Sequence, residues 1–228
     1  MANDIYALIP ARRDSQGLPR KNIALINGEP LISFTISAAI NASVFSNIVV
    51  STNDAEVVDV ARKSRIETLE RPEGLANASA NADSVVAHFI RTYQVSPLSV
   101  IVYLQPTSPL RTGAHIKRAC EEFFAESARG LVSVVEVSRS FYKVYARQED
   151  GTLSGLFGSD APYCSRQSIP QLFLPNGAIY IFRVNEFMQD EQIPRSDIIP
   201  FIMDEQSSID IDTLDDLTRV AAIIKKNE

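Results

Sequence analysis

A short basic segment near the start of the chain has the residue types that bind phosphate. It covers residues 10–22, and its cationic side chains are Arg12, Arg13, Arg20 and Lys21. Small residues in such a loop let backbone N–H groups approach phosphate oxygens, while arginine and lysine neutralise charge that grows as pyrophosphate departs. The segment matches neither the P-loop nor the GxGxxG pattern. Composition alone leaves two interpretations open, a triphosphate-binding loop and a solvated basic loop.

Two carboxylates much later in the chain have a spacing that suits a metal ion. Asp210 and Asp212 flank Ile211 at the end of an apolar run. On an extended strand, residues two apart point to the same side, so both carboxylates can reach one hard cation such as Mg²⁺ or Mn²⁺. The alternative is that Asp212 or Thr213 caps the following helix, with Asp210 as a solvated neighbour. The residues alone leave both interpretations open.

The elements that must position these residues alternate between strands and helices. Apolar runs predict strands at residues 5–9, 48–50, 100–104, 132–137, 178–182 and 198–203. Apolar residues at helical spacing predict helices at residues 31–42, 55–64, 83–93, 113–127 and 212–226. This alternation indicates an α/β, Rossmann-like fold, with a mainly parallel sheet and helices on both faces. The basic loop follows the first strand, at the carboxyl edge where open α/β sheets bind ligands.

Length and composition fit one folded enzyme domain. The chain has 228 residues, enough for a single α/β sheet with an insertion. We expect the insertion at about 138–175, where aromatic residues, Gly and Pro are mixed with scattered basic residues. Hydrophobic residues make up 45% and charged residues 22%, which argues against disorder and a fibrous role. The formal net charge of -6 gives no global attraction to nucleic acid or to a membrane surface, so neither is an expected partner.

The cysteines and the apolar segments also limit the class of protein. Cys120 and Cys164 lie far apart without metal-ligand spacing, so zinc and a disulfide framework are not expected. No segment approaches the roughly 18 continuous apolar residues of a membrane span. The first residues lack the basic region of a signal peptide. We therefore expect a cytoplasmic protein.

Six motifs follow one another along nearly the whole chain. They are IPAR at 9–12 with Ser15, GLP at 17–19 and KN at 21–22; VST at 50–52 with Asp54; RP at 71–72; LQPTSPLR at 104–111; PNGAIY at 175–180; and SIDID at 208–212. Together they resemble the signature of the CMP-sialic acid synthetases, the N-acylneuraminate cytidylyltransferases. The most specific of these motifs are LQPTSPLR and PNGAIY. The first loop is less specific, because it is shared with the wider sugar nucleotidyltransferase group. The resemblance implies one cytidylyltransferase domain over residues 1–228, with a dimerisation insertion at about 138–175.

The resemblance implies an enzyme that transfers CMP from CTP to the anomeric hydroxyl of a sialic-acid-type, nine-carbon acidic sugar. It assigns CTP binding to Ala11, Arg12, Ser15, Lys21, Asn22, Arg71 and Ser84. It assigns Mg²⁺ or Mn²⁺ to Asp210 and Asp212, and catalysis to these two with Arg12 and Lys21. One departure is Gln16, where the family commonly has lysine. Either Arg13 or Arg20 compensates for that missing charge, or turnover is slower.

For the acidic sugar, the resemblance points to residues in two parts of the chain. They are Gln105, Thr107, Ser108 and Tyr180 in the main domain, and Lys143 and Arg166 in the insertion. In the family the insertion forms a homodimer and reaches into the neighbouring subunit's site, so Lys143 and Arg166 would act in trans. The alternative for both is ordinary surface charge. A second departure is Ile193-Pro194, where some relatives have an aromatic pair near the N-acyl pocket, so the substituents of the sugar stay open.

Competing functions are weighed against this one. A cytidylyltransferase for a legionaminic, pseudaminic or Kdo-type acid would use the same chemistry. A non-catalytic sugar-nucleotide sensor would keep the fold, but retention of Arg12, Lys21 and both carboxylates argues against a dead site. A glycosyltransferase fits the DxD pattern of residues 210–212, although we expect no acceptor-binding domain after it.

Three other polar residues are expected to be structural. Asp54 follows a strand in the sequence Ser-Thr-Asn-Asp, which favours a helix cap over a catalytic role. His88 and His115 lie in expected helices without a partner at ligand spacing. A proton shuttle would require histidine at the reacting hydroxyl, so neither is assigned to the chemistry.

Overall fold

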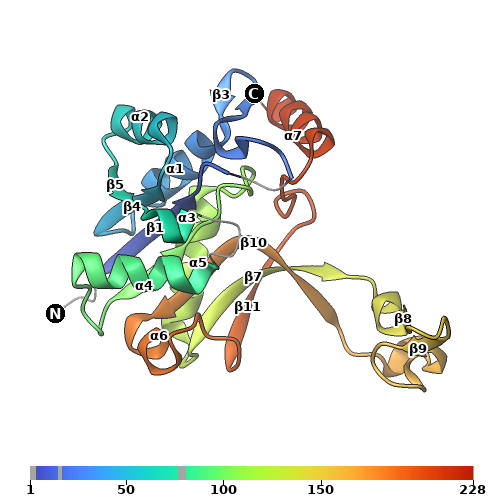
Figure 1. Cartoon of the computed structure of the whole chain (residues 1–228). Helices are drawn as coiled ribbons and strands as arrows, with labels where there is room; N and C mark the ends of the chain where they lie inside the picture. Colours follow the sequence, from blue (N-terminus) through green and yellow to red (C-terminus); the bar gives the residue numbers. More distant parts are fainter. Residues whose placement is uncertain (1–3, 15–16, 77–80, 228) are drawn as a thin grey trace.

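The fold is built on one seven-stranded sheet (Figure 1), as seen in a computed structural model that describes residues 4–14, 17–76 and 81–227. The strand order is β11-β7-β10-β6-β1-β4-β5. The strands are β1 (Ile5–Ala11), β4 (Asn47–Thr52), β5 (Glu67–Glu70), β6 (Val100–Tyr103), β7 (Gly130–Val137), β10 (Leu172–Arg183) and β11 (Ile198–Met203). Every pairing is parallel except those of β10 with β6 and β7. The prediction of a mainly parallel α/β sheet is confirmed.

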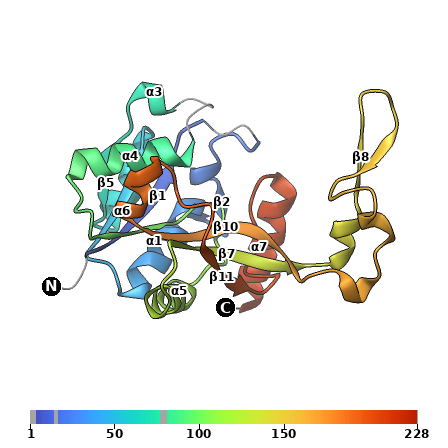
Figure 2. The ribbon, with the colours of Figure 1, turned by 90° about the horizontal axis from the view of Figure 1, so that it is seen from below.

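Helices cover both faces of this sheet, as the view in Figure 2 shows. The helices that pack on it are α1 (Leu31–Ala42), α2 (Ala55–Lys63), α4 (Ala82–Tyr93), α5 (Gly113–Ala125) and α6 (Val184–Asp190). Successive strand residues point to opposite faces. In β1, Ala7 and Ile9 pack with α1, α2 and α5, whereas Leu8 packs with α4 and α6. Because both faces are covered, the central strands are continuous apolar runs.

A smaller apolar cluster joins the hairpin that follows the basic loop to the C-terminal helix. Helix α7 (Leu214–Asn227) lies beside a hairpin of β2 (Leu25–Ile26) and β3 (Glu29–Pro30), and Figure 1 shows the C-terminal end next to β3. Ile26, Leu31, Ile211 and Val220 are buried together there. This packing brings the segment before α7 against the loop that follows β1.

The segment between β7 and β10, residues 138–171, projects from the sheet as an arm (Figure 2). Its elements are η2 (Arg139–Lys143), β8 (Tyr145–Arg147), β9 (Leu153–Gly155), η3 (Ala161–Tyr163) and η4 (Arg166–Ser168). Large apolar side chains are exposed on it, among them Phe141, Leu153, Leu156, Phe157 and Tyr163. Residues 172–175, which we expected in the insertion, pair with β7 and belong to the sheet.

The structure adds elements that the sequence patterns do not predict. Strand β5 at the sheet edge buries only Leu69 well, so it has no apolar run to mark it. The short helices α6 and α3 (Glu73–Ala76) were also missed, and α7 begins at Leu214 rather than at residue 212. None of the helices in the described ranges combines the length and the apolar character needed to cross a bilayer.

Candidate active site

A pocket of about 430 Å³ opens where β1 and β6 end. The predicted residues that line it are Arg12, Lys21, Asn22, Arg71, Gln105, Thr107, Asp210 and Asp212. They come from the loop after β1, the segment after β5, the loop after β6 and the segment before α7. The basic loop and the two carboxylates, far apart in sequence, therefore face one cavity.

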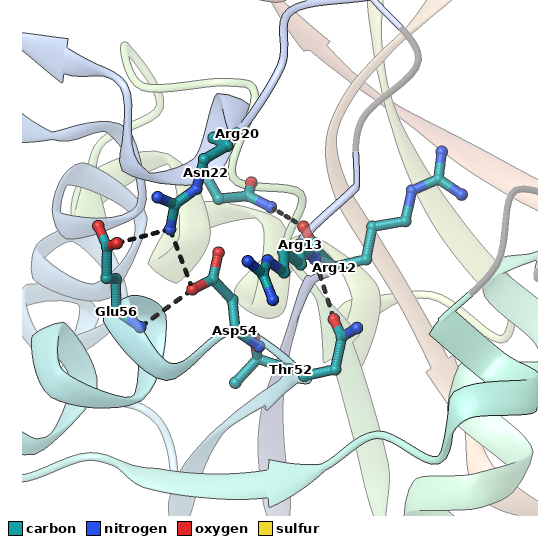
Figure 3. A network of polar contacts seen from close by, with 8 residues as sticks. Arg12, Arg13, Arg20, Asn22, Thr52, Asp54 and Glu56 are labelled. Carbon is teal, nitrogen blue, oxygen red and sulfur yellow. Dashed lines mark hydrogen bonds and ion pairs between the residues drawn. The ribbon is translucent and has the colours of Figure 1, made fainter.

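The basic loop is fixed by contacts with its own residues and with the turn between β4 and α2 (Figure 3). The Asn22 side-chain amide donates to the Arg12 carbonyl at 2.8 Å, which closes the loop on itself. The Arg13 backbone N–H donates to Oδ1 of Asn53 at 2.9 Å. Ser15 and Gln16, for which the sequence analysis makes predictions, lie outside the described residues. The loop thus reaches the pocket in a defined shape at both of its ends.

Asp54 is the N-cap of α2, as its sequence context predicts. Its carboxylate accepts from the Glu56 backbone N–H at 3.0 Å and is almost fully buried. Arg20 pairs with both acids, at 2.7 Å from Glu56 Oε1 and 3.5 Å from Asp54 Oδ1. These contacts place Arg20 against α2, and it lies outside the set of described residues that line the pocket.

Lys21 connects the basic loop to the carboxylates. Its ammonium donates to the Ile211 carbonyl at 2.7 Å and to Asp212 Oδ1 at 2.8 Å, although the side chain is largely buried. Gly17 permits the close approach, because a Cβ there would lie 2.8 Å from the Asp212 carbonyl oxygen. The two predicted catalytic segments are in direct contact.

Asp210 lines the same pocket. Burial raises the pKa of its carboxyl, and the neighbouring charge of Asp212 raises it further, while a hydrogen bond from Thr107 acts in the opposite direction. The Ile211 N–H donates to the Thr107 carbonyl at 2.9 Å, which holds the two segments together. An opposite charge near Asp210 would be stabilising.

The donor set of this pocket can be tested for Mg²⁺. Within the described ranges, no group of three or more His, Cys, Asp or Glu residues could hold a metal ion. Mg²⁺, however, is usually held by one or two carboxylates and completes its shell with water and substrate phosphate. Two carboxylates in a pocket that also contains cations for phosphate fit that pattern. The residues present therefore suit Mg²⁺ bound together with a nucleotide.

Arg71 lines the pocket together with the cations Arg12 and Lys21. Its guanidinium donates to the Ser51 carbonyl at 3.0 Å and to the Ser51 hydroxyl at 3.3 Å. Burial lowers its pKa, and the positive charge of nearby Arg12 lowers it further, with Tyr103 opposing. Two guanidinium groups close to one another in the wall of a pocket favour an anionic ligand between them.

The loop after β6 is held by a buried arginine whose role the sequence reasoning missed. Arg111 donates to the carbonyls of Gln105 and Ala178, at 3.0 and 2.9 Å, and to the Thr35 hydroxyl at 2.6 Å. Burial lowers its pKa to about 9. It is the last residue of the QPTSPLR motif, and its position there was the available signal. Arg111 fixes the loop that carries Gln105 and Thr107.

Ser108 in this loop and Gly177 beside it are packed tightly. Ser108 is fully buried, and its hydroxyl has no hydrogen-bond partner among residues 4–14, 17–76 and 81–227. Gly177 has φ +74, and a Cβ there would lie 2.6 Å from Gln105 Oε1. The positive φ favours glycine at position 177, and a Cβ there would displace the end of the Gln105 side chain.

A second pocket of about 440 Å³ adjoins the first. Both are lined by Asn81, Ala82, Tyr103 and Gln105. The second pocket is also lined by predicted Tyr180 and by aliphatic side chains that include Ile193, Pro194 and Ile198. Its location beside the predicted nucleotide pocket suits a second substrate.

The wall of the second pocket is held by Asp83, which the sequence reasoning did not single out. This largely buried carboxylate, in the first turn of α4, accepts from the Ile193 N–H and from Arg195 Nη2, each at 2.9 Å. The predicted ligand Ser84 instead bonds Asn81, through its N–H at 2.9 Å and its hydroxyl at 2.8 Å. Asn81 was the available signal for this role of Ser84, because asparagine is a preferred N-cap residue and Ser84 lies three residues after it.

The remaining predicted residues lie elsewhere. Ala11 is buried at the end of β1. Lys143 and Arg166 lie in the arm, and the Arg166 carbonyl accepts from Arg139 at 3.3 Å. In one chain these two side chains belong to the projecting arm rather than to the pocket where Lys21 and Asp210 meet.

Comparisons with known proteins show which family the chain resembles. A family model described as cytidylyltransferase matches residues 6–224. The N-acylneuraminate cytidylyltransferase of Streptococcus agalactiae serotype V is 32% identical over 93% of this chain and 51% of its own length. The chain thus spans about half the length of that relative. The CMP-N,N'-diacetyllegionaminic acid synthase of Legionella pneumophila is 32% identical over 98% of this chain and 97% of its own.

A solved structure shares the fold. The structure titled CMP:2-keto-3-deoxy-manno-octonic acid synthetase complexed with CTP has a TM-score of 0.76, with 15% sequence identity. The match covers 99% of this chain and 100% of that one. At this identity the likeness concerns the arrangement of strands and helices.

Proposed function

The chain belongs to the cytidylyltransferase family, and on that premise we propose that it transfers CMP from CTP to the anomeric hydroxyl of an acidic nine-carbon sugar. The observation that carries the proposal is the meeting of two cations, Arg12 and Lys21, with two carboxylates, Asp210 and Asp212, in one pocket. Cations bind a triphosphate, and paired carboxylates suit its divalent counter-ion. Each half of this arrangement would be costly without the other.

The proposed reaction needs positioned charge rather than a covalent intermediate. The sugar hydroxyl loses its proton to solvent as its oxygen forms a bond to the α-phosphorus of CTP, and the bond from that phosphorus to the bridging oxygen breaks, so that pyrophosphate leaves. Arg12 and Arg71 are suited to bind phosphate oxygens with their planar guanidinium groups. Lys21 is a point charge suited to the departing pyrophosphate. Asn22, Ala11 and Ser15 would complete the nucleotide end of the pocket, and Ser84 lies in the first turn of α4 nearby.

Asp210 and Asp212 would hold Mg²⁺ or Mn²⁺ in this proposal. The ion would neutralise phosphate charge when it is bound. The raised pKa of the Asp210 carboxyl supports the assignment, because a partly desolvated carboxylate beside a second one is stabilised by a nearby cation. Lys21 keeps Asp212 oriented through its 2.8 Å contact.

The sugar is proposed to lie across the junction of the two pockets. Gln105 lines both, while Thr107 borders the nucleotide side and Tyr180 the second pocket. Ser108 lies buried behind this surface and would support the loop. The sugar's ring and its carboxylate would then face polar groups, and its substituents would face the aliphatic wall of Ile193 and Pro194.

A second candidate substrate class is a legionaminic-type acid, with the same chemistry. It is favoured by the near full-length match to the Legionella pneumophila synthase, which covers 97% of that protein. The aliphatic wall of the second pocket also suits an apolar substituent in place of a hydroxylated one.

We further propose a homodimer in which the arm of one subunit reaches its partner. The arm carries Lys143 and Arg166, which would bind the sugar carboxylate in the partner's pocket. Its exposed apolar side chains support the proposal, since Tyr163 is 81% and Leu153 63% exposed in one chain. Because the reaction would consume CTP, we place it in the cytoplasm.

The decisive experiment measures pyrophosphate release with Mg²⁺, all four nucleoside triphosphates and a panel of acidic sugars that includes N-acetylneuraminate, legionaminic acid and Kdo. Among the four nucleoside triphosphates, we expect only CTP to support pyrophosphate release. Among the sugars, a nine-carbon acid should be preferred over Kdo. The Asp210→Ala variant should lose the activity while its melting temperature stays near that of the wild type, and the exposed-surface variant Asp59→Ala should retain it. The absence of pyrophosphate release with every nucleotide and sugar would contradict the proposal and favour a non-catalytic sugar-nucleotide sensor.

A further inference from the structure

The cationic residues of the basic loop differ in what they contact. Arg12 and Lys21 line the nucleotide pocket, whereas the Arg20 guanidinium lies between Asp54 and Glu56 (Figure 3). The shorter contact, 2.7 Å from Arg20 Nη2 to Glu56 Oε1, is a charge-assisted hydrogen bond. Arg20 and the two acids are called the latch below.

The acidic side of the latch is rigid. Asp54 is only 3% exposed, and its carboxylate caps α2 by accepting the Glu56 N–H at 3.0 Å. Its own N–H donates to the Thr52 hydroxyl at 3.0 Å. Glu56 lies in the first turn of α2, where the helix dipole favours a negative charge. Because both acids lie at the N-terminus of α2, they hold the Arg20 guanidinium in a defined position.

The cationic side of the latch sits in a strained backbone. Arg20 has φ 54 and ψ 33, the left-handed region that residues with a Cβ enter at a cost of about 1 kcal/mol. Its carbonyl accepts from the Ile23 N–H at 3.1 Å. A side chain held by two acids can offset that cost and keep the turn in this conformation.

The next two residues are those that face the nucleotide. Lys21 reaches Ile211 and Asp212, and Asn22 reaches the Arg12 carbonyl. Because they follow Arg20 directly, the backbone direction at Arg20 sets where both side chains start. Loss of the latch would therefore misplace Lys21 and Asn22 without removing either.

We propose that Arg20 is a positioning residue for CTP, which holds the loop through Asp54 and Glu56 so that Lys21 and Asn22 face the pocket. This inference rests on the proposed function. It also identifies Arg20 as unavailable to replace the positive charge absent at Gln16, because its guanidinium is engaged on α2. Nucleotide affinity would then depend on Glu56, a residue on a helix surface rather than in the pocket.

A direct role of Arg20 in phosphate binding predicts the opposite behaviour of one variant. If Arg20 swung into the pocket to contact CTP, Glu56 would compete with the nucleotide, and Glu56→Ala would tighten binding. If Arg20 acts through the latch, Glu56→Ala weakens binding. Glu56 is exposed, so the substitution should leave the fold intact.

The test is calorimetric titration of CTP, with Mg²⁺ and without sugar, into the wild type and into Arg20→Ala, Arg20→Lys, Glu56→Ala and Arg62→Ala. Arg62 makes a 2.9 Å pair with Asp59 on the same helix and is the matched control. We expect the CTP Kd to rise about three- to tenfold in Arg20→Ala, by less in Glu56→Ala, and to recover in part in Arg20→Lys. Arg62→Ala should match the wild type.

Steady-state kinetics give a second reading that a general loss of stability would not produce. Arg20→Ala should raise the KM for CTP and leave the KM for the sugar unchanged. Unchanged or tighter CTP binding in Glu56→Ala would overturn the inference. If the wild type itself failed to bind CTP, the proposed function would fail first, and the latch would have no nucleotide loop to hold.

Discussion

The ammonium nitrogen of Lys21 lies 2.8 Å from Oδ1 of Asp212, a residue 191 positions later in the chain. The same ammonium lies 2.7 Å from the Ile211 carbonyl oxygen. A cation from the first loop and a carboxylate from the last segment of the pocket therefore form one unit. The charges that would meet a triphosphate are held in place by contacts within the protein, which is the condition for electrostatic preorganisation.

Replacing Lys21 should affect turnover much more than folding. In Lys21→Met, the departing pyrophosphate loses a point charge and Asp212 loses its partner, so kcat/KM for CTP should fall about 10²- to 10³-fold. Initial rates of pyrophosphate release measure the loss. Lys63→Met, at an exposed lysine at the end of α2, is the control and should stay within twofold of the wild type. A loss below threefold in Lys21→Met would remove Lys21 from the chemistry.

The trans role of the arm can be tested by mixing two inactive variants. Asp210→Ala and Lys143→Ala each disable one half of the proposed site. In a heterodimer, one site pairs an intact pocket with an intact arm, so an equal mixture of co-refolded chains should recover about a quarter of wild-type activity. Each variant alone should stay inactive or nearly so. If sedimentation shows dimers but the mixture recovers no activity, Lys143 does not act in the partner's pocket.

Asp83 is predicted to control the sugar and not the nucleotide. In Asp83→Asn, the amide oxygen can still accept the Ile193 N–H, but the NH₂ group then faces Arg195 and the charge pair is lost. The wall of the second pocket loosens, and the KM for the sugar should rise about tenfold while that for CTP is unchanged. Asp59→Asn, in an exposed pair, is the matched control. Equal changes in both KM values would contradict this assignment.

Arg111 is predicted to be essential for stability. Arg111→Met keeps much of the volume but leaves the carbonyls of Gln105 and Ala178 and the Thr35 hydroxyl without their donor. Buried acceptors without partners should lower the free energy of unfolding by about 2–4 kcal/mol, measured by urea denaturation. Arg91→Met, at an exposed arginine in α4, should change it by less than about 0.5 kcal/mol. A similar value for both variants would show that the Arg111 contacts add no net stability.

His115 predicts how stability depends on pH. Its Nδ1 accepts the Thr112 N–H at 3.3 Å in a capping box, and burial lowers the pKa of the imidazole. The unfolded chain then binds a proton more readily than the folded one, so stability is complete above the ordinary pKa of 6.5 and is lost as the pH falls through the lowered value. His115→Gln keeps a capping-box acceptor without a titrating group.

The measurement compares melting temperatures at pH 7 and pH 5. The decrease should be smaller in His115→Gln than in the wild type. Part of the decrease should remain, because burial also lowers the pKa of His88. A decrease of equal size in both proteins would mean that His115 does not contribute.

Sequence patterns predicted the parts of the fold that depend on local periodicity. The runs that became β1 and β6, and the basic loop at their carboxyl edge, follow from apolar continuity and from parallel-sheet geometry. The direction of β10 did not follow, because an antiparallel strand covered on both faces has the same apolar run as a parallel one.

The site was predictable where one segment carries the chemistry and not where distant segments meet. Arg12, Lys21 and the two carboxylates stood out by type and spacing. The contacts of Asp83 with Ile193 and of Arg20 with Glu56 could not be predicted, because each joins segments that become neighbours only after folding. A charged residue in a sequence does not show which partner it will find.

The contact between Lys21 and Asp212 has a consequence for synthesis on the ribosome. Lys21 is translated 191 residues before the carboxylate it binds. While the chain grows, its basic loop exists without the acidic half of the pocket, and the apolar cluster of Ile26, Ile211 and Val220 is incomplete. The proposed site would therefore be complete only after α7 has emerged and docked.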